Sequence, residues 1–373
     1  MKLVYVADNG FSSNKGLNYY STPNYIHVSY MKKYFEEIVF FARRDKYDHS
    51  YRPIDKRYSV YLFGKYDFLN MSKKMIEQIR GADIVIVYGV NGYIAQFIAH
   101  RMKKKVIAYI GGDSKEALMV TKNIKKILIA PIIGKLDKWK CSTADYVHYC
   151  AEFLYKRYPT KKERLICSGA NIIIDNNCLK NRYNRISKDL LILGLIGYTH
   201  NNIKGIDIAI RALSLVKDTL NVELQIVGRG DTSFLMQLAT ELGVENNVKF
   251  LGTKKAGDEI YSWLDNVDIY LQPSRSEGLP RATVEAMSRG CPVIASNAGA
   301  LPELIDNEYI IKRDDYQKLA CSIEKLARDP IEMKKQSYRN FEQAKEFKPE
   351  IREKKYNAFY EKIRQENIMP GRM

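Results

Sequence analysis

Two kinds of segment alternate along the whole sequence, and this alternation most limits the folds open to the chain. Short runs rich in β-branched and aromatic residues predict strands, and the amphipathic stretches between them predict helices. The expected strands cover 2–7, 37–42, 59–63, 83–89, 105–110 and 146–150 in the first half, and 190–197, 222–228, 248–252, 268–274, 292–296 and 309–312 in the second. Such alternation is typical of α/β folds with parallel sheets. The sequence therefore predicts two Rossmann-like, doubly wound parallel-sheet domains.

The length of the chain agrees with two domains, because 373 residues are about twice a common single domain. The alternation is lost over 172–190, where Asn, Asp and Lys gather, and it then starts again. We therefore expect an N-terminal domain over 1–175, a linker over 176–189 and a C-terminal domain over 190–345. A C-terminal helix is expected over 346–373, with a return to the N-terminal domain as an open option.

Positive charge is concentrated in the first half of the chain. The net charge is +17, and residues 1–180 contain 31 Lys and Arg against 16 Asp and Glu. Within them, residues 100–140 contain 11 basic and 3 acidic residues. A field of this sign favours an anionic partner, either nucleic acid or a negatively charged lipid surface. The composition, 46% hydrophobic and 28% charged, is that of a folded globular protein rather than a disordered one.

The spacing of the cysteines and the hydropathy of the chain indicate the cellular compartment of the protein. The six cysteines, at 141, 150, 167, 178, 291 and 321, form no CxxC pair, so they predict free thiols and neither a zinc site nor thiol exchange. The N-terminal segment has too few consecutive apolar residues for a signal peptide, and no later segment reaches ~18 of them. We therefore expect a cytoplasmic protein that spans no membrane.

The segment PSRSEGLPRATVEAMSRGCPVIAS, residues 273–296, has the pattern of a ligand-binding loop between a strand and a helix. The helix is expected to begin near Arg281. Free backbone N–H groups at such a helix start bind phosphate groups, and Gly278 permits a close approach. Glu285 lies about one turn inside the expected helix, from which its carboxylate can reach two ribose hydroxyls. Glu277, on the loop before the helix, can receive the hydroxyls of a sugar.

Seven residues separate Glu277 from Glu285, and PSRSEGLP and EAMSRG surround them. This segment resembles the Glu–seven residues–Glu motif of the retaining glycosyltransferases of the GT-B fold, in particular the large family 4 (glycosyl transferases group 1). The resemblance covers the second half of the chain and, more weakly, the first. It implies two Rossmann-like domains facing one another across a cleft, and an enzyme that transfers a sugar from a nucleoside-diphosphate sugar with retention of the anomeric configuration.

The resemblance also assigns residues to the donor site. Lys204 matches the lysine that holds the donor diphosphate, a role for which a cation with three hydrogen-bond donors is suited. Many relatives carry Arg where this chain has Tyr198, so either Arg229 or Arg275 is a candidate to replace it. The other residues placed around the donor are Glu285, Gly278, Leu279, Pro280, Thr283, Gly197, His200, Gly228 and Gly16.

In the first half, the resemblance points to two loops. Residues 8–16, DNGFSSNKG, are expected to form a glycine-bearing loop after the first strand, with Gly16 near the donor phosphate and the acceptor. Where relatives often carry a catalytic-site His, this chain has GGD at 111–113. Asp113 is therefore the acidic candidate for catalysis, and capping of a helix that begins near Ser114 is an equal alternative.

Sugar transfer needs a stabilised diphosphate leaving group and a deprotonated acceptor hydroxyl. The resemblance implies same-face attack, in which a phosphate oxygen of the donor takes the proton and no protein nucleophile is needed. On this interpretation the catalytic candidates are Glu277, Lys204 and Asp113. The sequence contains neither Asp-x-Asp nor a His and carboxylate spacing typical of a metal site, so we expect no metal and no cofactor, the nucleotide sugar being a substrate.

The expected function is transfer of a sugar from a UDP- or GDP-linked donor to a glycan or lipid-linked acceptor, in bacterial capsule, O-antigen or exopolysaccharide biosynthesis. Two alternatives stay open. Nucleotide-sugar 2-epimerases share the fold, although EGLPRATVEAM is not their pattern. A nucleic-acid binder would explain the charge, but it would favour Arg with exposed aromatic residues, whereas the densest basic stretch here is lysine among Ile and Leu. We therefore expect no nucleic-acid partner.

A basic amphipathic segment indicates where the chain could meet a membrane. A helix is expected over 117–128 with an apolar stripe on one face and lysines on the other. The stripe consists of Ala117, Val120, Ile124, Ile127 and Leu128, and the lysines are Lys122, Lys125 and Lys126. Beyond Pro131, IIGKLDKWK continues the mixture. The stripe predicts either peripheral binding to an anionic membrane, at the inner face of the plasma membrane, or ordinary packing against the sheet.

Overall fold

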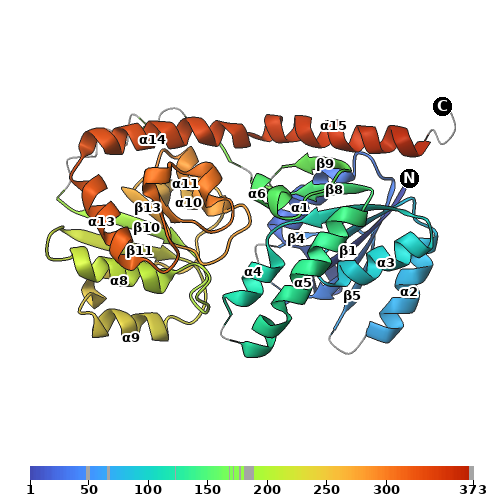
Figure 1. Cartoon of the computed structure of the whole chain (residues 1–373), viewed down its shortest axis with the longest axis horizontal. Helices are drawn as coiled ribbons and strands as arrows, with labels where there is room; N and C mark the ends of the chain where they lie inside the picture. Colours follow the sequence, from blue (N-terminus) through green and yellow to red (C-terminus); the bar gives the residue numbers. More distant parts are fainter. Residues whose placement is uncertain are drawn as a thin grey trace. The chain divides into compact units, whose positions relative to one another are not determined.

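The computed structural model of the chain describes residues 1–47, 51–64, 68–121, 123–167, 169–170, 172–175, 178–179 and 189–368. Two compact units emerge (Figure 1). Unit 1 consists of Met1–Ser114, Pro131–Gly169 and Glu350–Met373, and unit 2 of Lys115–Ala130 and Ala170–Pro349. Residues 115–130 therefore group with unit 2, which differs from a continuous domain over 1–175. The expected linker over 176–189 lies mostly outside the described residues.

Unit 1 is built on a nine-stranded sheet. Its parallel strands lie in the order β5-β3-β1-β6-β7-β8-β9. Strand β2 pairs antiparallel with the end of β1, and β4 pairs antiparallel with β2. The strands are β1 Lys2–Asn14, β2 Leu17–Tyr20, β3 Glu37–Arg44, β4 Arg52–Pro53, β5 Ser59–Phe63, β6 Ile84–Tyr88, β7 Lys105–Ile110, β8 Tyr146–Tyr149 and β9 Glu163–Ile166. The helices around them are α1 Thr22–Met31, α2 Phe68–Arg80, α3 Asn91–Arg101, α5 Ile124–Thr143, whose residues from Pro131 group with this unit, and α6 Glu152–Arg157. Strands β6 and β8 are almost wholly buried, as parallel strands covered on both faces are.

Strand β1 is longer than the sequence pattern predicts. The segment 8–16, expected as a loop, continues the strand as far as Asn14. Lys15 and Gly16 then adopt positive φ angles of 48° and 77° and lead into β2. Two successive residues with positive φ form the tight turn that suits an antiparallel hairpin. The prediction of a loop over 8–16 is therefore wrong, and Gly16 lies at a hairpin tip.

Unit 2 contains a six-stranded, wholly parallel sheet in the order β12-β11-β10-β13-β14-β15. The strands are β10 Leu191–Ile196, β11 Val222–Val227, β12 Val248–Phe250, β13 Ile269–Gln272, β14 Val293–Ser296 and β15 Ile310–Ile311. The α-helices of this unit are α8 Ile206–Val216, α9 Ser233–Glu241, α10 Asp258–Leu264, α11 Arg281–Ser288, α12 Leu301–Leu304, α13 Tyr316–Ala327 and α14 Pro330–Ala344. Helix α4, Ser114–Met119, also groups with this unit from Lys115 onward. The 3-10 turns are η1 Glu245–Asn247, η2 Asn307–Tyr309 and η3 Lys345–Phe347. The predicted α/β fold with parallel sheets is confirmed. The strand order reverses between β10 and β13, which is where ligands bind in sheets of this type.

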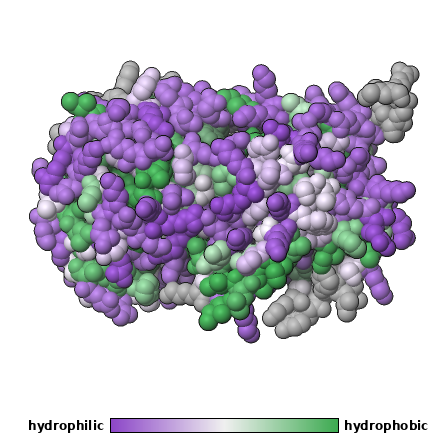
Figure 2. Space-filling model, in the orientation of Figure 1, coloured by the Kyte–Doolittle hydropathy of each residue, from purple (hydrophilic) through white to green (hydrophobic). Residues whose placement is uncertain are grey.

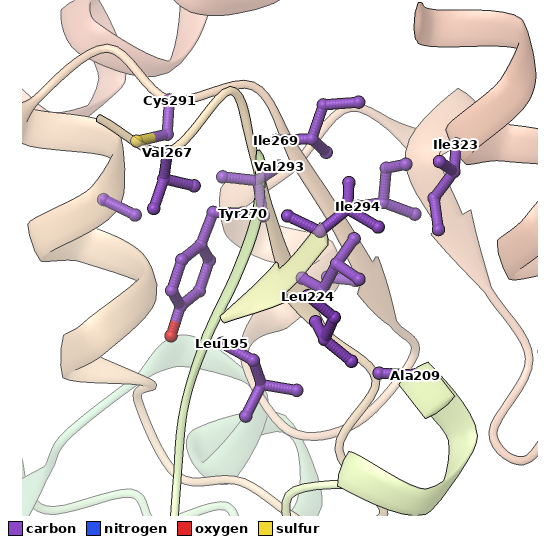
Figure 3. Close-up of a cluster of buried hydrophobic side chains, with 14 of the residues drawn as sticks. Leu195, Ala209, Leu224, Val267, Ile269, Tyr270, Cys291, Val293, Ile294 and Ile323 are labelled. Atoms are coloured by element: carbon purple, nitrogen blue, oxygen red, sulfur yellow. The ribbon is translucent and has the colours of Figure 1, made fainter. Parts of the chain in front are cut away.

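The core of unit 2 lies between this sheet and the helices that cover it. Figure 3 shows side chains from four neighbouring strands packed with residues of α8 and α13: Leu195, Leu224, Ile269, Tyr270, Val293, Ile294, Ala209 and Ile323. The hydroxyl of Tyr270 donates a hydrogen bond of 2.9 Å to Gln272 Oε1. Packing in the core is thereby connected to the end of β13 and to the loop that follows it.

The last helix, α15 (Pro349–Ile368), belongs to unit 1 from Glu350 onward. Its buried side chains Tyr356, Phe359, Tyr360 and Ile363 are part of the hydrophobic core of that unit. Tyr356 stacks on Tyr30 of α1, with ring centroids 4.6 Å apart. Unit 1 therefore draws its core from both ends of the sequence.

The segment expected as one helix over 117–128 forms parts of two helices instead. Helix α4 ends at Met119, and α5 begins at Ile124. Helix α5 then continues through Pro131 to Thr143. A proline in a helix interior removes a backbone hydrogen bond and costs ~3 kcal/mol, so packing of the second half of α5 must hold the helix together.

Candidate functional site

Two loops meet in unit 2 at the point where the strand order reverses. The first, 197–205, follows β10, and the second, 273–280, follows β13. A backbone hydrogen bond of 2.8 Å from Arg275 N to Ile203 O joins them. These loops carry most of the residues that the sequence assigns to the donor site.

The carboxylate of Glu277 is held by three hydrogen bonds to one of its oxygens. Glu277 Oε1 accepts from Ser274 Oγ at 2.6 Å, from Lys204 Nζ at 2.7 Å and from Gln272 Nε2 at 3.0 Å. The residue is buried, with 8% of its surface exposed. Within the described residues, Oε2 receives no hydrogen bond. This arrangement fixes the orientation of the carboxylate and leaves one oxygen to accept from a ligand hydroxyl.

Gln272 is the centre of this network, and sequence reasoning missed it. Its Nε2 donates to Ser274 Oγ at 2.7 Å as well as to Glu277, and its Oε1 accepts from Tyr270 and from Thr283 Oγ1, the latter at 3.3 Å. The side chain is fully buried. The sequence did contain a signal for Gln272, which is an amide residue at the end of an otherwise apolar strand. A buried amide needs hydrogen-bond partners for both its N–H donors and its oxygen, so other polar residues are expected around it.

Glu285 lies on α11 in different surroundings. It is partly buried, and within the described residues its carboxylate receives no hydrogen bond. Burial raises the pKa of this carboxyl above its ordinary value, and the nearby positive charge of Arg281 offsets part of that rise. A carboxylate that has lost water without gaining a partner is a binding-site feature, because a ligand donor can restore the missing hydrogen bond.

Lys204 reaches Glu277 because the loop after β10 is tightly folded. Gly205 adopts a left-handed φ of 67°, and a Cβ at this position would lie 2.0 Å from Pro273 O. A Cβ at Gly228 would lie 1.8 Å from Gly197 O. Both glycines therefore permit a close approach of backbone segments that any side chain would prevent.

The two arginines proposed to replace the usual Arg have different surroundings. The Arg275 guanidinium donates to both carboxylate oxygens of Asp207, at 2.9 and 2.7 Å, and to Asp314 Oδ1 at 2.7 Å. These bonds favour a role in holding the loops together. Arg229 lies 5.2 Å from the ring centroid of Tyr198 and is exposed, so it is the better placed of the two to meet an anionic ligand. His200 packs beside Tyr198, with ring centroids 5.4 Å apart.

The remaining predicted residues of this unit lie at the start of α11. Pro280 precedes the helix, and its carbonyl accepts from Thr283 N at 3.0 Å. Gly278 O accepts from Ala300 N at 3.1 Å, and Leu279 packs against the core of the unit. The expected helix start near Arg281 is confirmed.

Asp113 and Gly16 lie in unit 1. Asp113 is buried, and its carboxylate accepts hydrogen bonds from Tyr158 Oη at 2.9 Å and from Arg157. These partners give Asp113 a structural role that ties the loop after β7 to the end of α6. Gly16, at the hairpin tip described above, has no atom within 4 Å of the position its Cβ would take.

The structure bears on the other sequence expectations as well. All six cysteines are free, and Cys321 is the exposed one. No group of three or more His, Cys, Asp or Glu side chains that could hold a metal ion occurs in the described part of the chain. Among the helices described, none has both the length and the apolar character needed to cross a membrane.

Residues 188–329 match a family model described as glycosyl transferases group 1. Protein CapJ of Staphylococcus aureus is 34% identical over 245 residues, which are 63% of this chain and 60% of that protein. The capsular polysaccharide biosynthesis glycosyltransferase CapM of the same organism is 28% identical over 160 residues, 42% of each chain. The matches thus span less than two thirds of the length of these relatives.

The fold resembles that of a solved structure over nearly its whole length. The crystal structure of Anabaena HepE in complex with UDP and glucose superposes with a TM-score of 0.68, at 16% identity, over 98% of both chains. At this identity the likeness shows the fold. The chain therefore has the GT-B fold, with two parallel-sheet α/β domains, and its residues 188–329 are similar to the glycosyl transferases group 1 family.

Proposed function

We propose that this protein is a retaining glycosyltransferase of family 4, which moves a sugar from a nucleoside-diphosphate sugar to a glycan or lipid-linked acceptor. The names of the relatives support a place in surface polysaccharide biosynthesis, since CapM is named for capsular polysaccharide. The UDP and glucose bound to HepE support a nucleotide-sugar donor. We further propose that the protein acts in the cytoplasm, at the inner face of the plasma membrane.

The observation that carries this proposal is the pairing of Lys204 with a carboxylate that is otherwise held in place. Lys204 Nζ lies 2.7 Å from Glu277 Oε1, and Glu285 lies eight residues farther along the chain, without a hydrogen-bond partner among the described residues. A cation, a fixed carboxylate and an unsatisfied carboxylate at the switch point of one sheet can bind, respectively, the diphosphate, the sugar and the ribose of one donor molecule.

On donor binding, the diphosphate competes with Glu277 for the charge of Lys204. The lysine then stabilises the negative charge that grows on the departing diphosphate, and the N–H groups at the start of α11 assist it. Ser274 and Gln272 keep Glu277 in place while its free Oε2 accepts a sugar hydroxyl. Glu285 accepts hydrogen bonds from the ribose.

Retention follows on this proposal from attack on the same face of the sugar, with a phosphate oxygen of the donor as the base. Lys204 supplies the cation at the leaving group, so the reaction proposed here needs no metal and is expected to persist in a chelator. Exclusion of water protects the oxocarbenium-like transition state from hydrolysis.

A thermal-shift screen of nucleoside diphosphates and their sugars tests donor binding. A nucleotide at 100 times its dissociation constant should stabilise the protein by ~2.7 kcal/mol. Lys204→Met should reduce that shift, because it removes the diphosphate partner. Lys325→Met is the matched control, since Lys325 also pairs with a glutamate, Glu308, but on the surface of α13.

Two results would contradict the proposal. One is the absence of any shift with every nucleoside diphosphate, and the other is equal loss of binding in Lys204→Met and Lys325→Met. Conversion of a nucleotide sugar to its 2-epimer without acceptor would instead assign the epimerase reaction.

A further inference from the structure

Helix α5 carries a row of apolar side chains that face solvent. Ile124, Leu128 and Ile132 are 72%, 71% and 59% exposed. Their spacing of four residues places them in one row along the helix. Figure 2 shows hydrophobic residues gathered over the place where Figure 1 draws the first half of α5. Ordinary packing of this stripe against the sheet, one of the two interpretations of the sequence, is therefore wrong.

The buried face of α5 lies on the other side of the helix. At about 100° per residue, Ala130, Ile133 and Asp137 fall roughly opposite the row of Ile124 and Leu128. All three are at most 8% exposed. This packed face belongs to the second half of α5, from Ala130 onward. Residues 124–129 are all exposed, so within the described residues nothing covers the apolar row of the first half.

The charge around the apolar row is of one sign. Lys125, Lys126, Lys135 and Lys138 are all exposed, whereas Lys122 of the expected lysine face lies outside the described residues. The three acidic side chains of residues 100–140 are buried, and each is paired with a base. The pairs are Asp113 with Arg157, Glu116 with Arg313 and Asp137 with Lys140. Acidic side chains of this stretch therefore do not neutralise the exposed lysines.

We propose that the first half of α5 docks on an anionic lipid bilayer, with Ile124, Leu128 and Ile132 inserted at the interface and the lysines on the headgroup phosphates. Apolar rows flanked by lysine are suited to such a surface. A second copy of this chain is a poorer occupant, because a two-fold interface would bring the same lysines against one another. This inference deepens the proposed function and rests on it in one respect, the acceptor. Docking on lipid would bring a lipid-linked acceptor within reach of the enzyme.

Vesicle flotation of the full chain tests the docking. Binding is expected to vesicles that contain phosphatidylglycerol, to be weak on pure phosphatidylcholine, and to fall steeply as salt rises. The triple variant Ile124→Ser, Leu128→Ser, Ile132→Ser and the double variant Lys125→Glu, Lys126→Glu should each weaken binding about tenfold or more. The matched control is Leu215→Ser, Ile331→Ser, Tyr338→Ser, which removes exposed apolar side chains from α8 and α14 and should bind as the wild type does.

Three results would overturn the proposal. They are failure to bind anionic vesicles at low salt, equal effects of the α5 triple variant and the control triple, and a dimer in solution that the α5 triple dissociates without any vesicle binding. Nucleoside-diphosphate binding, measured on the same variants by thermal shift, should stay unchanged. If a variant loses vesicle binding but keeps nucleotide binding, the result tests the docking surface alone. If the wild type binds no nucleotide, the result contradicts the proposed function instead.

Discussion

Two glutamates of unit 2 have the same chemistry and opposite surroundings. Glu277 is held by Gln272, Ser274 and Lys204, so its orientation is fixed before any ligand binds. Glu285 is partly desolvated, and burial raises the pKa of its carboxyl. A fixed group can act on the geometry of the reacting sugar, whereas an unsatisfied group gains most from binding itself.

Substitution of each glutamate should therefore change a different kinetic constant. Glu285→Gln is expected to raise the dissociation constant of the donor nucleotide with a smaller effect on turnover, because ribose contacts exist in the ground and transition states alike. Glu277→Gln is expected to lower kcat by about tenfold or more with little change in nucleotide affinity. Calorimetry with the nucleotide and steady-state kinetics with a verified donor and acceptor separate the two effects.

The pH dependence of donor binding supplies a check on Glu285. Because burial raises its pKa, Glu285 takes up a proton at a higher pH than an ordinary carboxyl does. Nucleotide affinity should therefore fall on acidification while other carboxylates are still ionised, and this loss should be absent in Glu285→Gln. Glu308→Gln, an exposed glutamate paired with Lys325, is the control. An identical pH profile in wild type and Glu285→Gln would remove Glu285 from the site.

At the scale of elements, α5 is anchored by a buried ion pair. Asp137 Oδ1 lies 2.9 Å from Lys140 Nζ and accepts a hydrogen bond of 2.8 Å from Tyr93 Oη of α3. Both charged side chains are at most 2% exposed. Gln96 of α3 donates to Lys140 O at 3.0 Å. These polar contacts fix the second half of α5 on α3, while the first half keeps its exposed apolar row.

Replacing one partner of this ion pair should destabilise the protein far more than replacing both. Lys140→Met leaves the Asp137 carboxylate buried without its cation and is expected to cost ~3–5 kcal/mol. The double variant Asp137→Leu, Lys140→Met should recover most of that loss, because no buried charge remains. Urea unfolding of wild type, both single variants and the double variant measures the coupling, and additive effects would contradict it.

At the scale of the whole molecule, α15 brings the end of the chain back onto unit 1. Tyr356 of α15 lies against two buried histidines, His27 and His148, whose rings are 5.1 Å apart. His27 Nδ1 is 3.2 Å from Tyr356 Oη, and His148 Nε2 is 2.9 Å from Cys167 O. Burial lowers the pKa of His148 to about 4, and burial together with the charge of His148 lowers the pKa of His27.

This histidine pair should make the protein sensitive to acid. An unfolded histidine takes up a proton near pH 6.5, whereas folded His148 resists protonation until about pH 4. Stability is therefore full above pH 6.5 and falls as the pH drops from 6.5 toward 4, by ~3 kcal/mol for this residue alone. Urea unfolding at several pH values should show a shallower fall in His148→Phe than in wild type. His200→Gln, at an exposed site in unit 2, should leave the slope unchanged.

The sequence by itself determined the elements and the main polar residues of the site. Its alternating runs predict the parallel strands of both units except β9, and they miss the short antiparallel strands β2 and β4. The segment around Glu277 and Glu285 indicates the loop and helix that carry them. These features are local, because a few neighbouring residues decide whether a segment is apolar on one face, ends at a glycine or begins a helix. The charge excess of residues 100–140 was likewise countable from composition.

Only the tertiary structure decided what each apolar or polar face contacts. Periodicity marks a face of α5 as apolar but does not say whether a neighbour covers it, and the structure leaves Ile124 and Leu128 exposed. Gln272 became a candidate only when folding brought Thr283 and Glu277 to its amide. The hydrogen bonds that Asp113 receives from Arg157 and Tyr158 likewise depend on folding, because these residues lie more than forty positions away along the chain. Contacts between residues far apart in sequence depend on how elements pack, and packing is a property of the whole fold.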